Sequence, residues 1–199
     1  MLQEVKTGQT DSFTNNEHFS SFLCLLPSSR AECRAAVLAK KSLFGLIESN
    51  VLANFLSARD TLARVADLLV RVKKTGEVWL AVSVYAPTGK ATLARENLWA
   101  SINKGLDSAL FCVRQKHPNV QVVLGGDFND VVDDTLDNSE GRVTVPSRAA
   151  LRARQPLADI IATNDLRDCF RELFPNRAHG TNNAGQNCSR RLDRIYVSP

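Results

Sequence analysis

The sequence contains no long apolar run. The longest apolar stretches among its 199 residues, such as Val78–Tyr85, fall well short of the roughly 18–20 residues that cross a bilayer. Polar and charged residues follow Met1 almost at once, so we also expect no secretory signal peptide. With 44% hydrophobic residues, the chain is too apolar to be mainly disordered. We therefore expect one soluble, intracellular globular domain over residues 1–199, without membrane association.

Cysteine and histidine are few and scattered. The chain has five cysteines with no Cys-x-x-Cys pair, and only three histidines. This spacing argues against a structural zinc site and against a disulfide framework. We expect reduced thiols. The cysteines are Cys24, Cys33, Cys112, Cys169 and Cys188.

Lysine is absent from residues 142–199, which hold ten arginines. The segment just before them, residues 127–140, holds six acidic residues and no basic one, although the formal net charge of the whole chain is only +4. Because a guanidinium group makes bidentate contacts with phosphate, this pattern suits arginines that bind a polyanion beside acids that hold a divalent cation. The alternative is biased codon usage together with a solvated acidic loop.

Apolar periodicity predicts a layered mixture of strands and helices. Residues 77–85 alternate with a period of two, and the preceding Lys73–Gly76 is typical of a hairpin turn. The spacing between Leu93 and Val113 predicts an amphipathic helix, whereas residues 64–72 fit a strand or a helix. We further expect strands over 35–39, 120–124 and 191–197, helices over 147–153 (with Ser147 as N-cap) and 156–162, and a long surface loop over 5–30. This succession predicts an α/β or α+β domain.

The strongest local feature is the run Val120-Gln-Val-Val-Leu-Gly-Gly-Asp-Phe-Asn129. An apolar strand ends there in two glycines, which allow a sharp turn and a close approach to a ligand. Asp127 and Asn129 follow at the carboxyl end of the strand, where sites commonly form in layered folds. A carboxylate can accept a proton or hold a water molecule, and an amide can orient a phosphate oxygen. An ordinary Asp/Asn turn is the alternative.

Three other segments become informative beside this run. Gln3-Glu4 offers a carboxylate, Val84-Tyr85-Ala86-Pro87 places a tyrosine at the end of a strand, and Arg191-Leu-Asp-Arg-Ile-Tyr-Val-Ser198 places Asp193 within an otherwise apolar strand. An acid in such a strand needs a partner or a solvent-facing side, because an unpaired buried charge is costly. The alternatives are an exposed glutamate, a tyrosine ring that packs in the core, and an ion pair of Asp193 with an arginine at the sheet edge.

Taken together and in this order, the four segments resemble the endonuclease/exonuclease/phosphatase superfamily. Within it, the chain is most similar to the apurinic-like endonuclease domain of non-LTR (LINE-type) retrotransposons. A fifth run agrees with those elements: Leu166-x-Asp168-x-Phe170-Arg171-x-x-Phe174-Pro175, followed by Thr181. The resemblance is clearest over residues 78–198. It implies a DNase I-like fold, which is a four-layer α/β sandwich of two mixed β-sheets with flanking helices.

The resemblance also implies hydrolysis of phosphoesters with Mg²⁺ or Mn²⁺. A hard cation of this kind takes oxygen ligands and keeps several waters, so one or two carboxylates suffice. Glu4 is then the metal ligand, and Asp127 orients or activates the attacking water. Asn129 holds a phosphate oxygen, and Tyr85 acts near the phosphate or the leaving group. Asp193 resembles the acid that orients a catalytic histidine.

A DNA substrate follows from the LINE-type resemblance, which places Thr181, Arg190 and Arg191 in DNA-facing positions. We expect a nicking endonuclease that acts in the nucleus, has no obligate protein partner, and in the intact element is fused to a reverse transcriptase. Two substitutions fall among these positions, because Arg190 stands where LINE-type members have serine and Asn182 where they have an aromatic residue.

Two parts of the family pattern have no counterpart in the sequence. The family histidine follows a Ser-Asp pair downstream of the Arg-Leu-Asp strand, and none of the chain's three histidines lies in that place. The strand with a metal-site asparagine upstream of Gln3-Glu4 is also missing, so we expect a domain truncated at both ends. The alternatives are a catalytically inactive remnant that at most binds nucleic acid, and a phosphatase of the superfamily acting on a small phosphoester.

Overall fold

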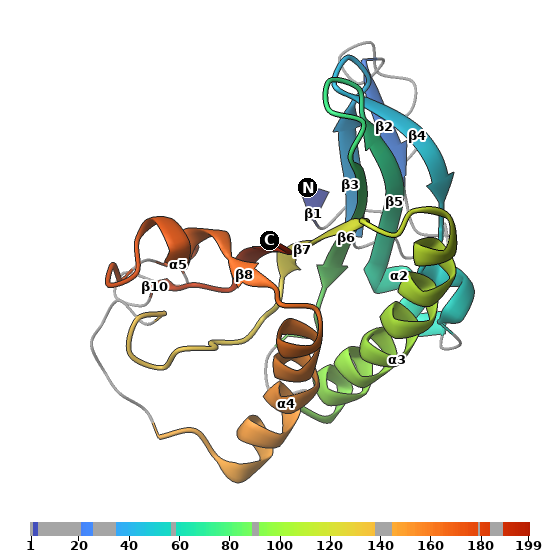
Figure 1. Cartoon of the computed structure of the whole chain (residues 1–199). Helices are drawn as coiled ribbons and strands as arrows, with labels where there is room; N and C mark the ends of the chain where they lie inside the picture. The colour runs from blue at the N-terminus through green and yellow to red at the C-terminus, as the bar shows by residue number, and fades with distance from the viewer. Residues whose placement is uncertain are drawn as a thin grey trace.

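Six strands form the central sheet of the structure, a computed structural model that describes residues 2–3, 21–25, 35–56, 59–88, 92–137, 145–178, 180–183 and 189–199. Their order is β4-β5-β6-β7-β11-β8 (Figure 1). Strands β6 and β7 run parallel, and the other neighbours run antiparallel. Their bounds are β4 (Phe44–Ser49), β5 (Val65–Val72), β6 (Val78–Tyr85), β7 (Gln121–Asp127), β8 (Arg167–Asp168) and β11 (Asp193–Val197).

A smaller sheet packs on one face of the central sheet. Its order is β1-β3-β2, from β1 (Leu2–Gln3), β2 (Phe22–Leu25) and β3 (Ala35–Lys40), and its pairs are antiparallel. Small apolar side chains let the two sheets approach each other. The buried cluster between them comprises Ala35, Val37, Ala39, Ala66, Leu68, Val70 and Tyr85.

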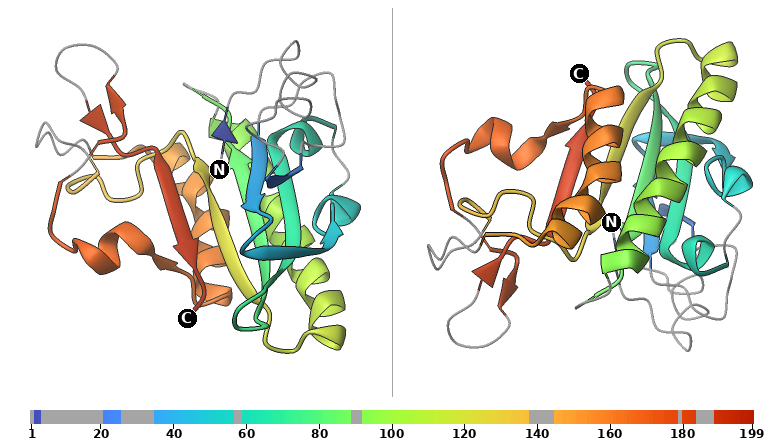
Figure 2. Two further views of the ribbon diagram at one scale, coloured as in Figure 1. Left: turned by 90° about the horizontal axis from the view of Figure 1, so that it is seen from above. Right: turned by 90° about the horizontal axis from the view of Figure 1, so that it is seen from below.

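Two long helices cover the opposite face of the central sheet. Helices α3 (Thr92–Lys116) and α4 (Arg148–Thr163) contact each other and lie side by side across the strands (Figure 2). Together with the strands they enclose the main core, in which Trp99 is the largest fully buried side chain. The predicted fold class of two sheets with flanking helices is therefore confirmed. The smaller sheet, however, is antiparallel in its described strands rather than mixed.

Short elements complete the described part of the chain. They are the 3-10 helix η3 (Ala53–Phe55), α2 (Arg59–Arg64), α5 (Cys169–Leu173), β9 (Asn182–Asn183) and β10 (Ser189–Arg190), the last two forming a separate antiparallel pair. No helix among the described residues is long and apolar enough to span a membrane.

Two of the predicted elements need correction. The helices expected on either side of Pro156 are one continuous helix, α4, in which Ala153, Leu157 and Ile160 are buried. Their spacing keeps one apolar stripe on α3 across the proline, so packing offsets the backbone hydrogen bond that proline removes. Within the loop expected over residues 5–30, β2 pairs with β3, and residues 5–20 and 26–30 lie outside the described ones.

Candidate active site

Three of the predicted site residues, Tyr85, Asp127 and Asp193, lie in one row across the neighbouring strands β6, β7 and β11. Strand β7 runs between β6 and β11, and the register pairs Tyr85 with Asp127 and Asp127 with Asp193. Residues paired in this way project from the same face of a sheet. Because β6 and β7 are parallel, the row also lies at their shared carboxyl ends, where ligands bind in layered folds. The fold thus brings together a phenol and two carboxylates from segments far apart in the sequence.

The turn after β7 fixes the fourth predicted residue, Asn129. Its backbone is in the left-handed region, with φ of 49°. The Asn129 N–H donates to Asp127 Oδ1 at 2.9 Å, and Asn129 Nδ2 donates to the Ala86 carbonyl at 2.8 Å. The Ala86 N–H in turn donates to the Asp127 carbonyl at 2.8 Å. Since an amide carries two N–H groups, Asn129 keeps a second donor beyond the one held by Ala86.

Gly126 permits this turn because it leaves room for the neighbouring strand. A Cβ atom at this position would lie 1.9 Å from the Val84 carbonyl oxygen, and the φ of Gly126 is 143°. Both features exclude any side chain. The close approach predicted for these glycines was to a ligand, whereas at Gly126 the group approached is the backbone of β6.

Phe128 anchors the turn from within the core. Its side chain is fully buried, meets Trp99 edge-on at 4.8 Å between ring centroids, and stacks on Tyr196 at 5.9 Å. Burial raises the pKa of Tyr196 to about 12, so this phenol stays protonated. Of the two tyrosines in the chain, Tyr85 is the one that lies in the row.

Arg64 is a residue of this site that the sequence did not indicate. It ends α2 and is 8% exposed, its Nη1 donates to the Tyr85 carbonyl at 3.5 Å, and its Cζ lies 5.9 Å from the centroid of the Tyr85 ring. A guanidinium group beside the row adds positive charge where an anionic substrate would bind. In the sequence, Arg64 is an isolated basic residue before an apolar run, and nothing there indicates its partner. The Tyr85 ring itself belongs to the core between the sheets, so packing accounts for much of its placement.

The ligand atoms that the row offers are of the chemical type that a hard cation binds. Asp127 and Asp193 offer carboxylate oxygens, and Mg²⁺ needs only one or two of these with waters. Among the described residues there is no group of three or more histidine, cysteine or acidic side chains that could hold a metal. Glu4, the predicted metal ligand, lies outside the described residues, but β1 just before it contacts β7. The role of Glu4 stays a prediction.

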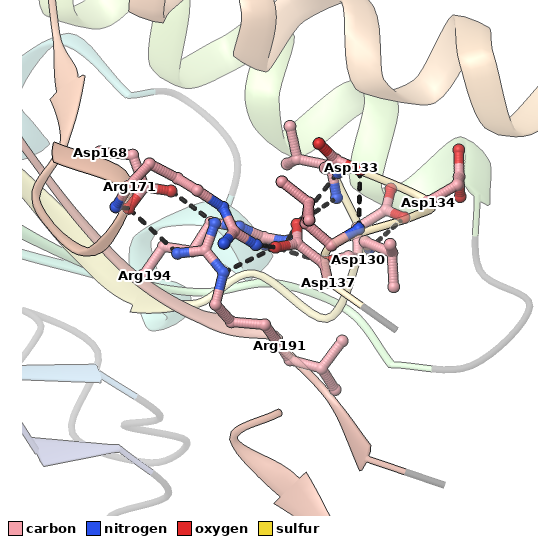
Figure 3. Close-up of polar contacts among 12 residues, drawn as sticks. Asp130, Asp133, Asp134, Asp137, Asp168, Arg171, Arg191 and Arg194 are labelled. Carbon is pink, nitrogen blue, oxygen red and sulfur yellow. Dashed lines mark hydrogen bonds and ion pairs between the residues drawn. The ribbon is translucent and has the colours of Figure 1, made fainter. Parts of the chain in front are cut away.

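The acidic segment after the site is neutralised by arginines of this chain. Asp137 is fully buried, and its carboxylate meets Arg171, Arg191 and Arg194 at 2.5, 2.7 and 2.8 Å (Figure 3). Burial by itself would raise the pKa of Asp137. The Asp133 N–H and Arg194 outweigh that effect and hold the pKa well below its usual range.

Three further carboxylates of this region also have arginine partners. Asp168 pairs with Arg191 at 2.5 Å, and Arg154 from α4 reaches Asp134 at 2.9 Å and Asp130 at 3.3 Å. The expectation that the acidic segment holds a divalent cation is therefore wrong for Asp130, Asp134 and Asp137. Their carboxylates organise a loop by binding side chains from α4, α5 and β11.

The predicted DNA contacts fall in two different environments. Arg191 is 3% exposed and bridges Asp137 and Asp168, so its expected contact with DNA phosphate is corrected to a structural role. Arg190 is exposed, and its part in DNA contact stays a prediction. Thr181 is exposed as well, and its Oγ1 accepts from the Leu192 and Asp193 N–H groups at 3.0 Å each. Thr181 thus also supports the strand that carries Asp193.

The structure of the chain is similar to several solved structures. It covers 67% of the human Nocturnin catalytic domain with bound sulfate anion, over 99% of its own length, at a TM-score of 0.61 and 15% identity. D. rerio TDP2 complexed with a single-strand DNA product gives 0.57 at 15% identity, with 99% of this chain and 69% of that chain covered. An endonuclease/exonuclease/phosphatase family protein from Bacteroides thetaiotaomicron gives 0.55 at 14% identity, with 90% and 60% covered.

These similarities define the fold. The chain has the DNase I-like architecture of the endonuclease/exonuclease/phosphatase proteins, as its motifs led us to expect. No protein-family model matches the chain, and neither does any curated protein sequence. The LINE-type resemblance and the roles of single residues rest on the motifs and on the geometry of the row.

Proposed function

We propose that the chain is a metal-dependent phosphoester hydrolase whose active site is the row of Tyr85, Asp127 and Asp193 together with Asn129. The observation that carries this proposal is the register, which aligns the three strand residues at the carboxyl ends of β6 and β7. A fold shared with Nocturnin and TDP2 supports it.

Each side chain has a task that its surroundings favour. The Asp127 carboxylate orients the attacking water and accepts its proton, while the Asn129 N–H bond holds Oδ1 in place. The second N–H of the Asn129 amide holds a phosphate oxygen. Tyr85 lies beside Arg64 and acts near the phosphate or the leaving group. Asp193 supplies the second carboxylate of the row.

The metal of this proposal is Mg²⁺ or Mn²⁺. Such an ion, when bound, neutralises the charge that develops on the phosphate and the leaving oxygen. Glu4 and a carboxylate of the row would hold it, because a hard cation takes oxygen ligands. The residues of the chain then need to position the water and the ester rather than provide all of the charge.

DNA is the substrate class that we propose, with nicking as the reaction and a LINE-type element, joined to a reverse transcriptase, as its source. The LINE-type order of the five motifs supports this choice. The exposed Arg190 beside the Asp193 strand supports it as well, because phosphate neutralisation dominates binding to nucleic acids.

Nicking of supercoiled plasmid with Mg²⁺ tests the proposal. The wild-type chain should convert the plasmid to the open circle, and EDTA should abolish this conversion. Asp127→Asn should lower the rate by about 100-fold or more, because a positioned general base contributes that much. Asparagine keeps an oxygen for the Asn129 N–H, so the turn is retained.

The matched control for this experiment is Asp107→Asn, which removes an exposed carboxylate on α3, the helix that covers the face of the sheet opposite the row. It should nick at the wild-type rate. Equal nicking by Asp127→Asn and wild type, or nicking that persists in EDTA, would contradict the proposal.

One observation favours a second candidate, hydrolysis of a small phosphoester. Five arginines of the C-terminal third, four of them in the cluster around the acidic segment, pair with carboxylates of the chain, which leaves fewer cations for a long polyanion. Turnover of a small phosphomonoester that exceeds plasmid nicking, and that is lost in Asp127→Asn, would select this candidate over DNA.

A further inference from the structure

Arg194 stands directly behind the proposed active site. It follows Asp193 on β11, and its register partner on β7 is Gly126, the neighbour of Asp127. Since successive side chains of a strand project from opposite faces, Arg194 points to the face opposite the row. Its side chain has no exposed surface. A buried guanidinium group therefore lies next to both strands that carry the carboxylates.

The guanidinium group of Arg194 joins β11 to the segment that follows the active-site turn. Its Nη1 donates to the Asp130 carbonyl at 2.7 Å, and its Nη2 donates to Asp137 Oδ2 at 2.8 Å. Asp130 is the residue immediately after Asn129. One of the two contacts of Arg194 thus holds the backbone one residue from the left-handed position of the turn.

Asp137 extends this contact to the rest of the segment. Its Oδ2 also accepts the Val132 and Asp133 N–H groups, at 3.2 and 3.0 Å. Its backbone carbonyl accepts the Arg191 N–H at 2.9 Å, so the end of the segment is also tied to the residues just before β11. Figure 3 shows Arg194 and Arg191 reaching the same carboxylate. The whole segment from Asp130 to Asp137 is closed onto β11.

We propose that Arg194 is a positioning residue of the active site, which fixes the turn presenting Asp127 and Asn129 by holding Asp130 and Asp137. This inference rests on the proposed function of the row. The planar fork of arginine donates to the carbonyl and to the carboxylate from two separate nitrogens, whereas lysine has one ammonium nitrogen with a shorter reach in their place. Arg194 therefore acts through geometry as well as charge.

Arg194→Lys is the variant that tests this role, with Arg171→Lys as its matched control. Arg171 binds the other oxygen of the Asp137 carboxylate from α5, and its second contact is the Arg177 carbonyl, away from the turn. Both substitutions keep the charge and remove one fork from the same carboxylate. Only Arg194→Lys releases the backbone beside Asn129.

Two measurements separate positioning from general stabilisation. In hydrogen exchange of the ligand-free chain, the amides of Asn129, Val132 and Asp133 should exchange about tenfold faster in Arg194→Lys than in Arg171→Lys, because a charged hydrogen bond to this segment is lost. In steady-state kinetics, kcat of Arg194→Lys should fall about 100-fold with KM unchanged, as expected when reacting groups are misplaced. Arg171→Lys should keep the wild-type kcat.

The result that overturns the inference is equal exchange in the two variants, or a wild-type kcat in Arg194→Lys once its exchange has increased. The exchange experiment needs no catalytic activity, so it decides the positioning of the turn even if the wild-type chain hydrolyses nothing. A wild-type chain without activity would contradict the proposed function alone. The two failures are therefore distinguishable.

Discussion

Gly126 is the residue on which the geometry of the site depends most directly. The sequence marked it as one of two adjacent glycines before an aspartate, where we expected a close approach to a ligand, and the structure shows a close approach to the Val84 carbonyl instead. Asp127 can reach its place beside Tyr85 only because β7 lies this close to β6. A side chain at position 126 would therefore disturb both the fold and the row.

Replacing Gly126 by alanine should destabilise the chain by about 2–4 kcal/mol. The added Cβ meets backbone rather than a flexible side chain, and the φ of 143° is unfavourable for alanine. Urea denaturation followed by circular dichroism measures the change. Gly45→Ala is the control, because a Cβ there meets nothing within 4 Å, and it should stay within about 0.5 kcal/mol of wild type. Equal stability of the two variants would contradict this account of the turn.

Single residues differ in how visible they are in the sequence. Asp127 and Asn129 were predicted because they follow a glycine pair at the end of an apolar strand. Arg64 and Arg194 were not, since an isolated base carries no sign of its partner until the register brings Tyr85 or Asp130 beside it.

Helix α3 follows its expected period because it presents one set of side chains to the core between sheet and helices. Strand β6 was predicted from its alternating sequence, although Ser83 and Tyr85 on its second face are buried as well. For residues 64–72 the apolar pattern fitted either a strand or a helix. Strand β5 is buried on both faces, so it has no alternation to display. The two-residue strands β1 and β8 are too short for any period.

The segment Asp130–Asp137 is an element held by charge rather than by regular hydrogen bonding. Asp137→Asn should destabilise the chain by about 3–5 kcal/mol at pH 7, because buried arginines lose their counter-charge. Since the folded pKa of Asp137 is depressed, its contribution is complete above the ordinary value of 3.8 and is lost as the pH falls below it. Thermal melting from pH 7 to pH 2 should therefore show the gap between wild type and Asp137→Asn narrowing only below about pH 4.

Asp133→Asn is the comparison for this pH series. Its carboxylate accepts the Thr135 and Leu136 N–H groups through Oδ1, which asparagine retains. It should melt within about 2 °C of wild type across the series. A difference in melting temperature between wild type and Asp137→Asn that stays constant over the whole pH range would contradict this account. It would show that the ionised form of Asp137 is not what stabilises the segment.

At the scale of the whole molecule, the fold joins segments that the sequence keeps apart. Residues 85, 127 and 193 meet in one row, while residues 137, 168 and 191 meet in the cluster behind it. Charge counts along the chain correctly located an acidic segment beside an arginine-rich one. They could not tell internal pairing from ligand binding, because the partner of a charge is decided by tertiary contacts.

The central claim is that the row forms one hydrolytic site, and hydrolysis of bis(p-nitrophenyl) phosphate with Mg²⁺ or Mn²⁺ tests it most directly. This small diester removes any contribution from DNA binding. The wild-type chain should release p-nitrophenol, and both Asp127→Asn and Asp193→Asn should lower kcat by about 100-fold, since each removes a carboxylate of the same site. A wild-type chain without turnover, or an Asp127→Asn variant as active as wild type, would contradict the account.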